Sequence, residues 1–288
     1  MKSGMIAVML VALWTGLVIA EDAKPVPNSW ASDYTTAYHR AKAEHKMLFV
    51  WFVNNRPTVC DQKFWSDVLL DRDVAVKLLD YVCVQVNLCT KLNVGQGTFM
   101  LADHPAFAHM LHQSGFAVID LSNEASPHFG QVVSAFPAGC GRPLDKKKTL
   151  VVLDLPPGTL TQRTLIYAVR MHPELPQSTA GSHDPLLANE ASKHSQHQAN
   201  IGVQGHHQWD QRFQYITAQL GGGLHAQEVC AESWPGQNLV EAAEECVHSW
   251  RQSSGHWSAV RTAHPRFGYD MRLGRNGIWY GTGIFGRY

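Results

Sequence analysis

Cysteine and histidine are the residues of this 288-residue chain with the clearest capacity for chemistry. The six cysteines have no Cys-x-x-Cys spacing, which weighs against a zinc ribbon and against a two-cysteine redox centre. An even number of cysteines permits disulfides if the chain is exported to an oxidising compartment. Each half of the chain can pair its own cysteines, since four lie in the first half and two in the second: Cys60, Cys83, Cys89, Cys140, Cys230 and Cys246.

Two pairings are compatible with these positions. Cys230 and Cys246 are sixteen residues apart, and a disulfide between them would contribute about 3 kcal/mol by loop closure. Cys89 and Cys140 both fall in predicted loops and form a second candidate pair, although the sequence leaves the pairing open. Cys83 lies in the middle of a predicted strand, where we expect a buried apolar residue.

The sixteen histidines are unevenly distributed, since ten of them lie between His172 and His264. Imidazole is both a metal ligand and a general acid or base near neutral pH, so this excess makes the second half the first place to look for a site. The 24 basic and 24 acidic residues balance, which argues against broad nucleic-acid binding. A Gly-x-Ser-x-Gly sequence is absent, which argues against a serine hydrolase of the nucleophile-elbow type.

We expect residues 1–20 to be a signal peptide. Lys2 precedes an apolar run over residues 5–14, and Val18 and Ala20 suit a cleavage site that leaves Glu21 as the first mature residue. The run is shorter than the ~20 residues of a spanning helix, and no later segment approaches that length. The alternative is an uncleaved membrane anchor. The expected protein is therefore secreted or periplasmic, with no stable membrane span after cleavage.

Residues 30–172 alternate between predicted helices and strands, which is typical of an α/β sheet. Continuous apolar runs over residues 47–53 and 81–86 predict strands that are buried on both faces. The other predicted strands are 116–121, 131–136 and 149–153, and the predicted helices include one capped by Ser32 or Asp33, one at 64–69, one at 104–113 and one at 161–171.

This order of elements resembles the thioredoxin fold over roughly residues 30–172. The resemblance rests on strand 47–53, the turn at residues 57–60 with the helix after it, residues 71–74 and strand 81–87. It implies a thiol site at Cys60.

Two departures from the thioredoxin pattern concern that thiol site. Pro57 stands where dithiol members have their first cysteine, and residues 114–117 lack the proline that precedes the third strand. Thiol exchange usually needs a resolving partner, so redox activity is in doubt. Cys60 is either a monothiol with a pKa lowered at a helix N-terminus or, as we favour, a structural or disulfide-bonded cysteine in a redox-degenerate scaffold.

Residues 173–185 are rich in Pro, Gly and Ser and predict a linker between domains at residues 21–172 and 186–288. The second half begins with a predicted helix at 186–199. Asn238 and Glu241 form a capping-box pattern for another helix, which we expect to end near Gly255. The Asn276-Gly277 pair between apolar runs predicts a hairpin. We expect His194 and His264 at the surface.

Several motifs of the second half occur in a recognisable order. Residues 250–256 form a Trp-x-x-Ser-x-Gly-His segment, and Gly268 is followed by an aromatic-rich run at residues 280–285. An Asp-x-Arg sequence at residues 210–212 precedes a glycine turn at residues 221–223. In this order they resemble the CAP superfamily of cysteine-rich secretory, antigen 5 and pathogenesis-related proteins, which have an SCP domain. The resemblance covers roughly residues 186–288 and implies an α-β-α sandwich.

The CAP resemblance implies a central cleft with two histidines and one or two glutamates, which in some members bind a divalent metal such as zinc. Carried over by motif, His256 is one histidine, Glu228 is a glutamate, and the other histidine is His206 or His207, of which we favour His207. The family's further glutamate is absent after Trp250. Two imidazoles and a carboxylate leave one position open on zinc, and we expect the three side chains within ligand-sharing distance, close enough for one ion to touch all of them. The alternative is a hydrogen-bonded polar cleft with no metal.

These patterns predict an exported two-domain α/β protein, with a thioredoxin-like domain followed by a CAP-like one. The expected function is binding, in which the CAP-like cleft engages a small ligand, a lipid, a peptide or a cell-envelope component. Two other functions stay open: a metal-dependent hydrolase that uses His256, Glu228 and His206 or His207, and a monothiol redox protein that uses Cys60.

Overall fold

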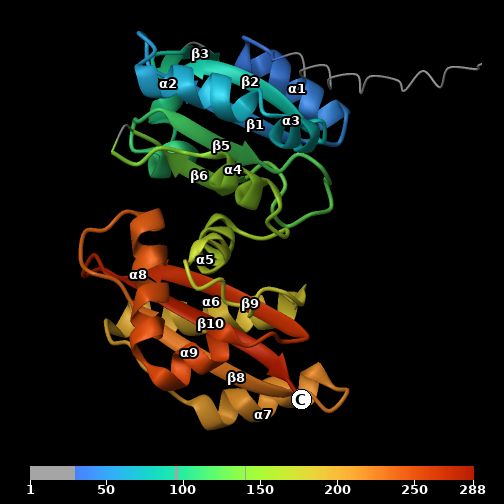
Figure 1. Cartoon of the computed structure of the whole chain (residues 1–288), viewed down its shortest axis with the longest axis vertical. Helices are drawn as coiled ribbons and strands as arrows, with labels where there is room; N and C mark the ends of the chain where they lie inside the picture. The colour runs from blue at the N-terminus through green and yellow to red at the C-terminus, as the bar shows by residue number, and fades with distance from the viewer. Residues whose placement is uncertain (1–29, 95–96, 140) are drawn as a thin grey trace, which may run out of the picture.

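The computed structural model describes residues 30–288, except residues 95–96 and 140. The predicted signal peptide lies outside the described residues. Within them the chain is a mixed α/β protein with two four-stranded sheets, each of which is covered by helices (Figure 1). None of the helices in this part of the chain has the length and apolar character needed to cross a membrane.

The first sheet has the strand order β2-β1-β5-β6. β1 pairs in parallel with β2 and antiparallel with β5, and β6 pairs antiparallel with β5. The strand predictions for these four segments are confirmed, with ends shifted by a few residues: β1 (Met47–Val53), β2 (Tyr81–Asn87), β5 (Gly115–Ile119) and β6 (Val132–Pro137). A separate two-stranded sheet joins β3 (Lys91–Val94) and β4 (Gly97–Met100).

Alternate side chains of β1 are buried on opposite faces of this sheet, as its continuous apolar run predicts. Leu48 and Val50 join the apolar cluster that contains Ala37 of α1. Phe49 and Trp51 join a second cluster on the other face. The helical segments of this half are α1 (Tyr34–Ala43), α2 (Val59–Lys63), the π-helix η1 (Phe64–Leu69), α3 (Arg72–Leu78), the 3-10 helices η2 (Leu101–Asp103) and η3 (Pro105–Met110), and α4 (Lys146–Leu153).

The strand prediction for residues 149–153 is wrong, because this segment belongs to α4. The Asp145 carboxylate caps the helix by accepting the Lys148 N–H at 2.8 Å. Val152 and Leu153 are then buried on one side of the helix. The cap and the buried face outweigh the strand propensity of the β-branched residues.

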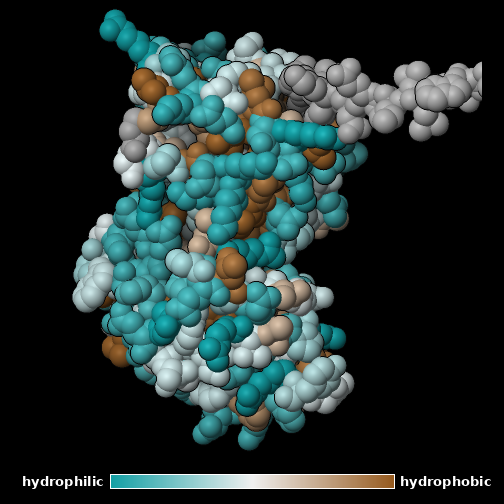
Figure 2. Space-filling model, viewed as in Figure 1, coloured by the Kyte–Doolittle hydropathy of each residue, from teal (hydrophilic) through white to brown (hydrophobic). Residues whose placement is uncertain are grey.

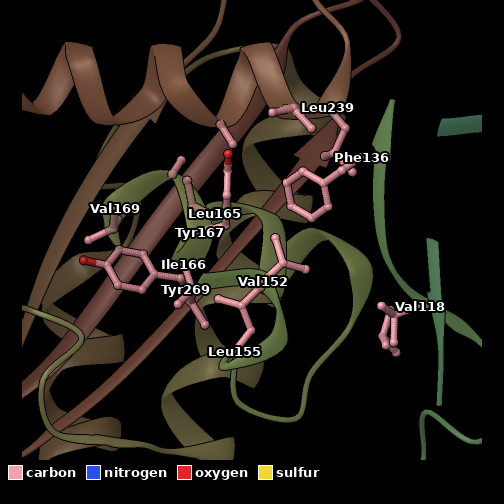
Figure 3. Close-up of a cluster of buried hydrophobic side chains, with 14 of the residues drawn as sticks. Val118, Phe136, Val152, Leu155, Leu165, Ile166, Tyr167, Val169, Leu239 and Tyr269 are labelled. Atoms are coloured by element: carbon pink, nitrogen blue, oxygen red, sulfur yellow. The ribbon is translucent and has the colours of Figure 1, made fainter. Parts of the chain in front are cut away.

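Helix α5 (Leu160–Met171) contacts elements of both sheets. It packs on β6 of the first sheet and on α8 (Leu239–Gln252) and β9 (Arg266–Leu273) of the second unit. Figure 3 shows the side chains that meet around it, among them Phe136 from β6, Leu165 from α5 and Tyr269 from β9. The cluster that contains Phe49 and Trp51 therefore runs from the first sheet to the second.

Residues 173–185, which we predict as a linker, are built into the second unit. The Ser178 N–H donates to the Val260 carbonyl, and the buried Ser178 hydroxyl lies 2.7 Å from the Tyr269 hydroxyl. Further along, β7 (Ser182–His183) pairs with β9. Backbone pairing thus fixes a segment whose composition alone suggests a flexible connection.

The second sheet has the order β7-β9-β10-β8, and its strands pair antiparallel except for the parallel pair of β7 and β9. Helices α6 and α7 pack on one face with Ala226 and Ile284, whereas α8 and α9 join the cluster on the other face. In the view of Figure 2 the surface of the second unit, in the lower part of the picture, is mostly hydrophilic. The bounds are α6 (Pro185–Ile201), α7 (Trp209–Leu220), β8 (His225–Glu232), α9 (Ser254–Arg261) and β10 (Trp279–Arg287).

The sequence predicts where some of these elements begin and end, and two of these three predictions are confirmed. Asn238 caps α8 with a capping box that includes Glu241, and Gly277, at φ +76°, lies in the turn between β9 and β10, as predicted. Gly255 does not end α8. Ser253 has an extended conformation and ends that helix, and α9 starts at once, so that His256 lies in the first turn of α9.

Candidate functional site

Glu228 lies at the centre of a polar cluster beside the edge strand β8 of the second sheet. Its carboxylate is fully buried, and Oε1 lies 2.9 Å from Nδ1 of His206. The other oxygen, Oε2, accepts a hydrogen bond from the Arg212 guanidinium. Nε2 of His194 lies 3.7 Å from Oε1. Both carboxylate oxygens are therefore engaged within the protein.

These neighbours keep Glu228 ionised. Burial raises the pKa of a carboxyl group, but the hydrogen bond from His206 and the positive charge of Arg212 outweigh it, so the pKa of Glu228 is lowered from its usual value. A carboxylate in this state accepts hydrogen bonds and donates none. Nδ1 of His206 therefore carries a proton.

His206 and His256 face each other across this cluster. Their Nε2 atoms are 3.1 Å apart, although the residues are fifty positions apart in the sequence. The His206 side chain is 41% exposed, so solvent reaches the pair while its carboxylate support stays buried. Burial, together with the neighbouring His206, lowers the pKa of His256. The two imidazole rings thus share one hydrogen bond at the surface.

The structure places His206 in this pair rather than His207, contrary to our preference from the sequence. Nε2 of His207 lies 3.2 Å from the Val203 carbonyl, and its ring packs near those of His194 and His197. Adjacent residues of a loop point in different directions, and the conformation of this loop determines which histidine reaches Glu228.

Buried hydrogen bonds hold the loop that carries His206. The Gly205 N–H donates to the side chain of Gln198 on α6 at 3.1 Å, and the Gly205 carbonyl lies 2.8 Å from Nε2 of His194. The Gln204 side chain donates to the Cys230 carbonyl of β8 at 3.2 Å. Gln198 is itself fully buried and donates to Thr282 of β10. The sheet and α6 together therefore set the position of the His206 ring.

His194 and Cys230 complete a buried group that the sequence analysis missed. Their ligand atoms and those of Glu228 lie within 4.8 Å of one another. His194 is 2% exposed, so the expectation that it lies at the surface is wrong, and so is that for His264, which is 4% exposed and stacks on Phe285. One sequence signal could have predicted the burial of His194. It lies seven residues after Leu187 and three after Ala191, which places all three on the same, buried face of the helix.

Protein contacts engage the side chains of this buried group. The Gly205 carbonyl engages His194, and Arg212 neutralises Glu228. Burial raises the pKa of Cys230 well above its usual value. We therefore assign this trio a supporting role beneath the His206–His256 pair.

Both disulfide pairings considered above are contradicted. Cys230 and Cys246 are free and buried, because β8 directs Cys230 toward His206 whereas Cys246 joins the cluster of α8 on the other face of the sheet. Cys89 is free and exposed, with the Asn55 amide 2.9 Å from its sulfur. Cys83 is buried in the middle of β2, as expected of a small apolar residue.

Cys60 is in a disulfide bond, so its sulfur does not titrate as a thiol. The proposed monothiol chemistry requires a thiolate, which the oxidised form cannot provide. The peptide bonds of the described residues are all trans, including those at residues 114–117.

Comparison of the sequence with models of known protein families finds no match, and a search of curated proteins finds none either. The function is therefore inferred from the geometry of the site.

Acid should destabilise the protein through His194. Burial lowers the pKa of His194 to about 4, against 6.5 for an ordinary histidine, although the charge of Glu228 opposes the shift. Between these pH values the unfolded chain binds a proton that the folded chain does not, so stability falls as the pH drops from 6.5 to 4, by up to about 3 kcal/mol. Denaturant unfolding at pH 7 and pH 4.5 should show a smaller loss for His194→Gln than for the half-buried control His197→Gln. Equal losses would contradict this assignment.

Proposed function

We propose that the chain is an exported ligand-binding protein and that the His206–His256 pair is the centre of its binding site. The observation that carries the proposal is the 3.1 Å separation of the two Nε2 atoms at a solvent-accessible edge, above a buried carboxylate that orients one of the rings. Export rests on the N-terminal sequence pattern. The small ligand, lipid, peptide or envelope component that we expect as a partner would meet the protein at this edge.

We further propose that the two units are a thioredoxin-like domain without dithiol chemistry and a CAP-like domain. The order β2-β1-β5-β6, with a parallel pair at one edge followed by two antiparallel pairs, supports the first assignment. An antiparallel sheet between α6 and α7 on one side and α8 and α9 on the other supports the second.

A divalent transition metal such as zinc is the simplest ligand for the histidine pair. Two nitrogen ligands of a tetrahedral zinc ion lie about 3.3 Å apart, given bonds of about 2.0–2.1 Å. The observed 3.1 Å separation of the two Nε2 atoms fits this requirement. When bound, such an ion would supply a Lewis acid with positions open to an external ligand.

Glu228 has a different role from the one predicted from the sequence. Its Oε1 lies on the Nδ1 side of the His206 ring, whereas His256 lies on the Nε2 side. One ion on both Nε2 atoms is therefore out of reach of Glu228. The carboxylate instead fixes the tautomer and direction of His206, a common role for acidic residues behind metal-bound histidines.

Zinc titration of the purified protein tests the proposal. We expect one zinc ion to bind the wild-type chain and His256→Ala to weaken this binding by about 100-fold, because one of two imidazole ligands is lost. His207→Ala is the matched control and should change the affinity by less than about threefold, since His207 is turned away from the pair. Glu228→Gln should weaken binding by about 10-fold or more, because the carboxylate that orients the His206 ring through Nδ1 is lost. Equal affinities for His256→Ala and His207→Ala would refute the site.

Metal-dependent hydrolysis is the second candidate function. The exposure of the His206 side chain favours it, because water could reach an ion held there. Zinc-dependent ester hydrolysis that is lost in His256→Ala and retained in His207→Ala would establish it.

A further inference from the structure

A cavity in the first sheet unit has the features of a separate ligand site. Its volume is about 370 Å³, which is within the usual range for small-molecule pockets. The floor is apolar and aromatic, with Trp51, Phe64 and Val68 each at most 7% exposed. Trp51 is held rigidly, since its ring stacks on Trp65 at a centroid distance of 5.4 Å and an interplanar angle of 8°.

A buried carboxylate lines this apolar cavity. Asp61 of α2 is 5% exposed, and three neutral groups donate to its Oδ2 atom: the Thr58 N–H at 2.8 Å, the Thr58 hydroxyl at 2.8 Å and the Asn54 amide at 3.3 Å. Burial raises the pKa of Asp61, but the hydrogen bonds from Thr58 and Asn54 outweigh it, and the pKa is lowered. The cavity therefore contains a negative charge.

The lysines around the cavity do not neutralise Asp61. Lys146 is bound by Asp71 at 2.9 Å and Asp73 at 2.7 Å. Lys63 is two residues from Asp61 on the same helix, and side chains at this spacing do not face each other. The groups that act on the pKa of Asp61 are the neutral hydrogen-bond donors of Thr58, Asn54 and Ser114, and no cation of the described residues is among them. Two further carboxylates, those of Asp67 and Asp145, line the same cavity.

We propose that this cavity binds a small organic ammonium ion, that is, a protonated amine on an aromatic or branched aliphatic group. The ammonium pairs with the Asp61 carboxylate, and the apolar group fills the space between Trp51, Phe64 and Val68. Aromatic faces attract cations, so the same walls suit both parts of the ligand. The hydrogen bonds that hold Asp61 in its ionised form leave its negative charge without a counter-ion, and an ammonium ligand would supply one. The site is independent of the His206–His256 pair.

Calorimetric titration of the wild-type chain with three probes of similar size tests this inference. Phenethylamine is the cation, 3-phenylpropan-1-ol is the neutral analogue and 3-phenylpropanoate is the anion. We expect phenethylamine to bind at one site at least about tenfold more tightly than either analogue, because a hydrogen bond between charged groups is worth about 1.5–3 kcal/mol. Absence of phenethylamine binding, or equal binding of the anion, would overturn the proposal.

Two matched substitutions test which carboxylate of the cavity binds the phenethylamine cation. Asp61→Asn keeps the size of the side chain and should weaken phenethylamine binding about tenfold or more. Asp67→Asn removes an exposed carboxylate of the same cavity and should change binding by less than about threefold. Unchanged affinity in a folded Asp61→Asn protein would overturn the assignment. If that variant does not fold, the comparison of the three probes on the wild-type chain still decides the question.

Discussion

Replacing Trp250 with alanine should lower the free energy of unfolding by about 3–5 kcal/mol. Trp250 lies on α8, is 0% exposed and packs near Tyr269 of β9 at a ring-centroid distance of 5.8 Å. Its cluster also contains residues of the first sheet, such as Phe49 and Phe116. The cavity left by the indole would therefore weaken both units. Among the residues that the structure describes, Nε1 of Trp250 has no hydrogen-bond partner, so the expected loss is one of packing.

Chemical denaturation of Trp250→Ala and Trp234→Ala provides the comparison. Trp234 is 67% exposed, and its removal should change the free energy of unfolding by no more than about 0.5 kcal/mol. We expect the two halves to unfold in one transition, because their apolar cluster is continuous. A Trp250→Ala variant as stable as Trp234→Ala would contradict the described core.

Replacing Gly268 with alanine should cost about 3 kcal/mol or more, although it adds a single methyl group. A Cβ at Gly268 would lie 2.1 Å from the Ala188 backbone nitrogen and 2.3 Å from the Leu187 carbonyl carbon. Helix α6 therefore rests directly on β9, and the added methyl group would push it away. Since α6 carries His194 and Gln198, the variant should also weaken zinc binding at the His206–His256 pair.

Gly255→Ala is the control for this substitution. A Cβ at Gly255 has no neighbouring atom within 4 Å, and Gly255 lies in the first turn of α9. Alanine favours a helix over glycine by up to about 1 kcal/mol, so stability should be unchanged or slightly higher. Thermal unfolding of the two variants distinguishes these outcomes, and similar midpoints would contradict the close contact between α6 and β9.

Much of the fold follows from local sequence patterns, because they report burial directly. The apolar run of β1 predicts a strand covered on both faces, and the Asn238–Glu241 pattern predicts the start of α8. Two predictions fail where tertiary contacts override local preference. Residues 149–153 have strand propensity but follow the helix cap of Asp145, and residues 173–185 have a linker composition but pair with β9.

The site is only partly predictable for a different reason. Glu228 and His256 follow from motif positions, and the structure brings both of them to His206. His206 and His207 are adjacent, however, and only the loop held by Gln198 and His194 determines which ring meets Glu228. Long-range hydrogen bonds of this kind leave no periodic signal in the sequence, nor does the separation of Cys230 from Cys246 by a sheet.

The most direct test of the proposed site is NMR of the imidazole nitrogens of histidine-labelled protein during zinc addition. Before zinc is added, His206 should show a proton on Nδ1, as the bond to Glu228 requires. One equivalent of zinc should shift the Nε2 signals of His206 and His256 and leave those of His207 unchanged. A zinc-dependent shift at His207, or none at His206 and His256, would contradict the proposal that this pair is the binding site.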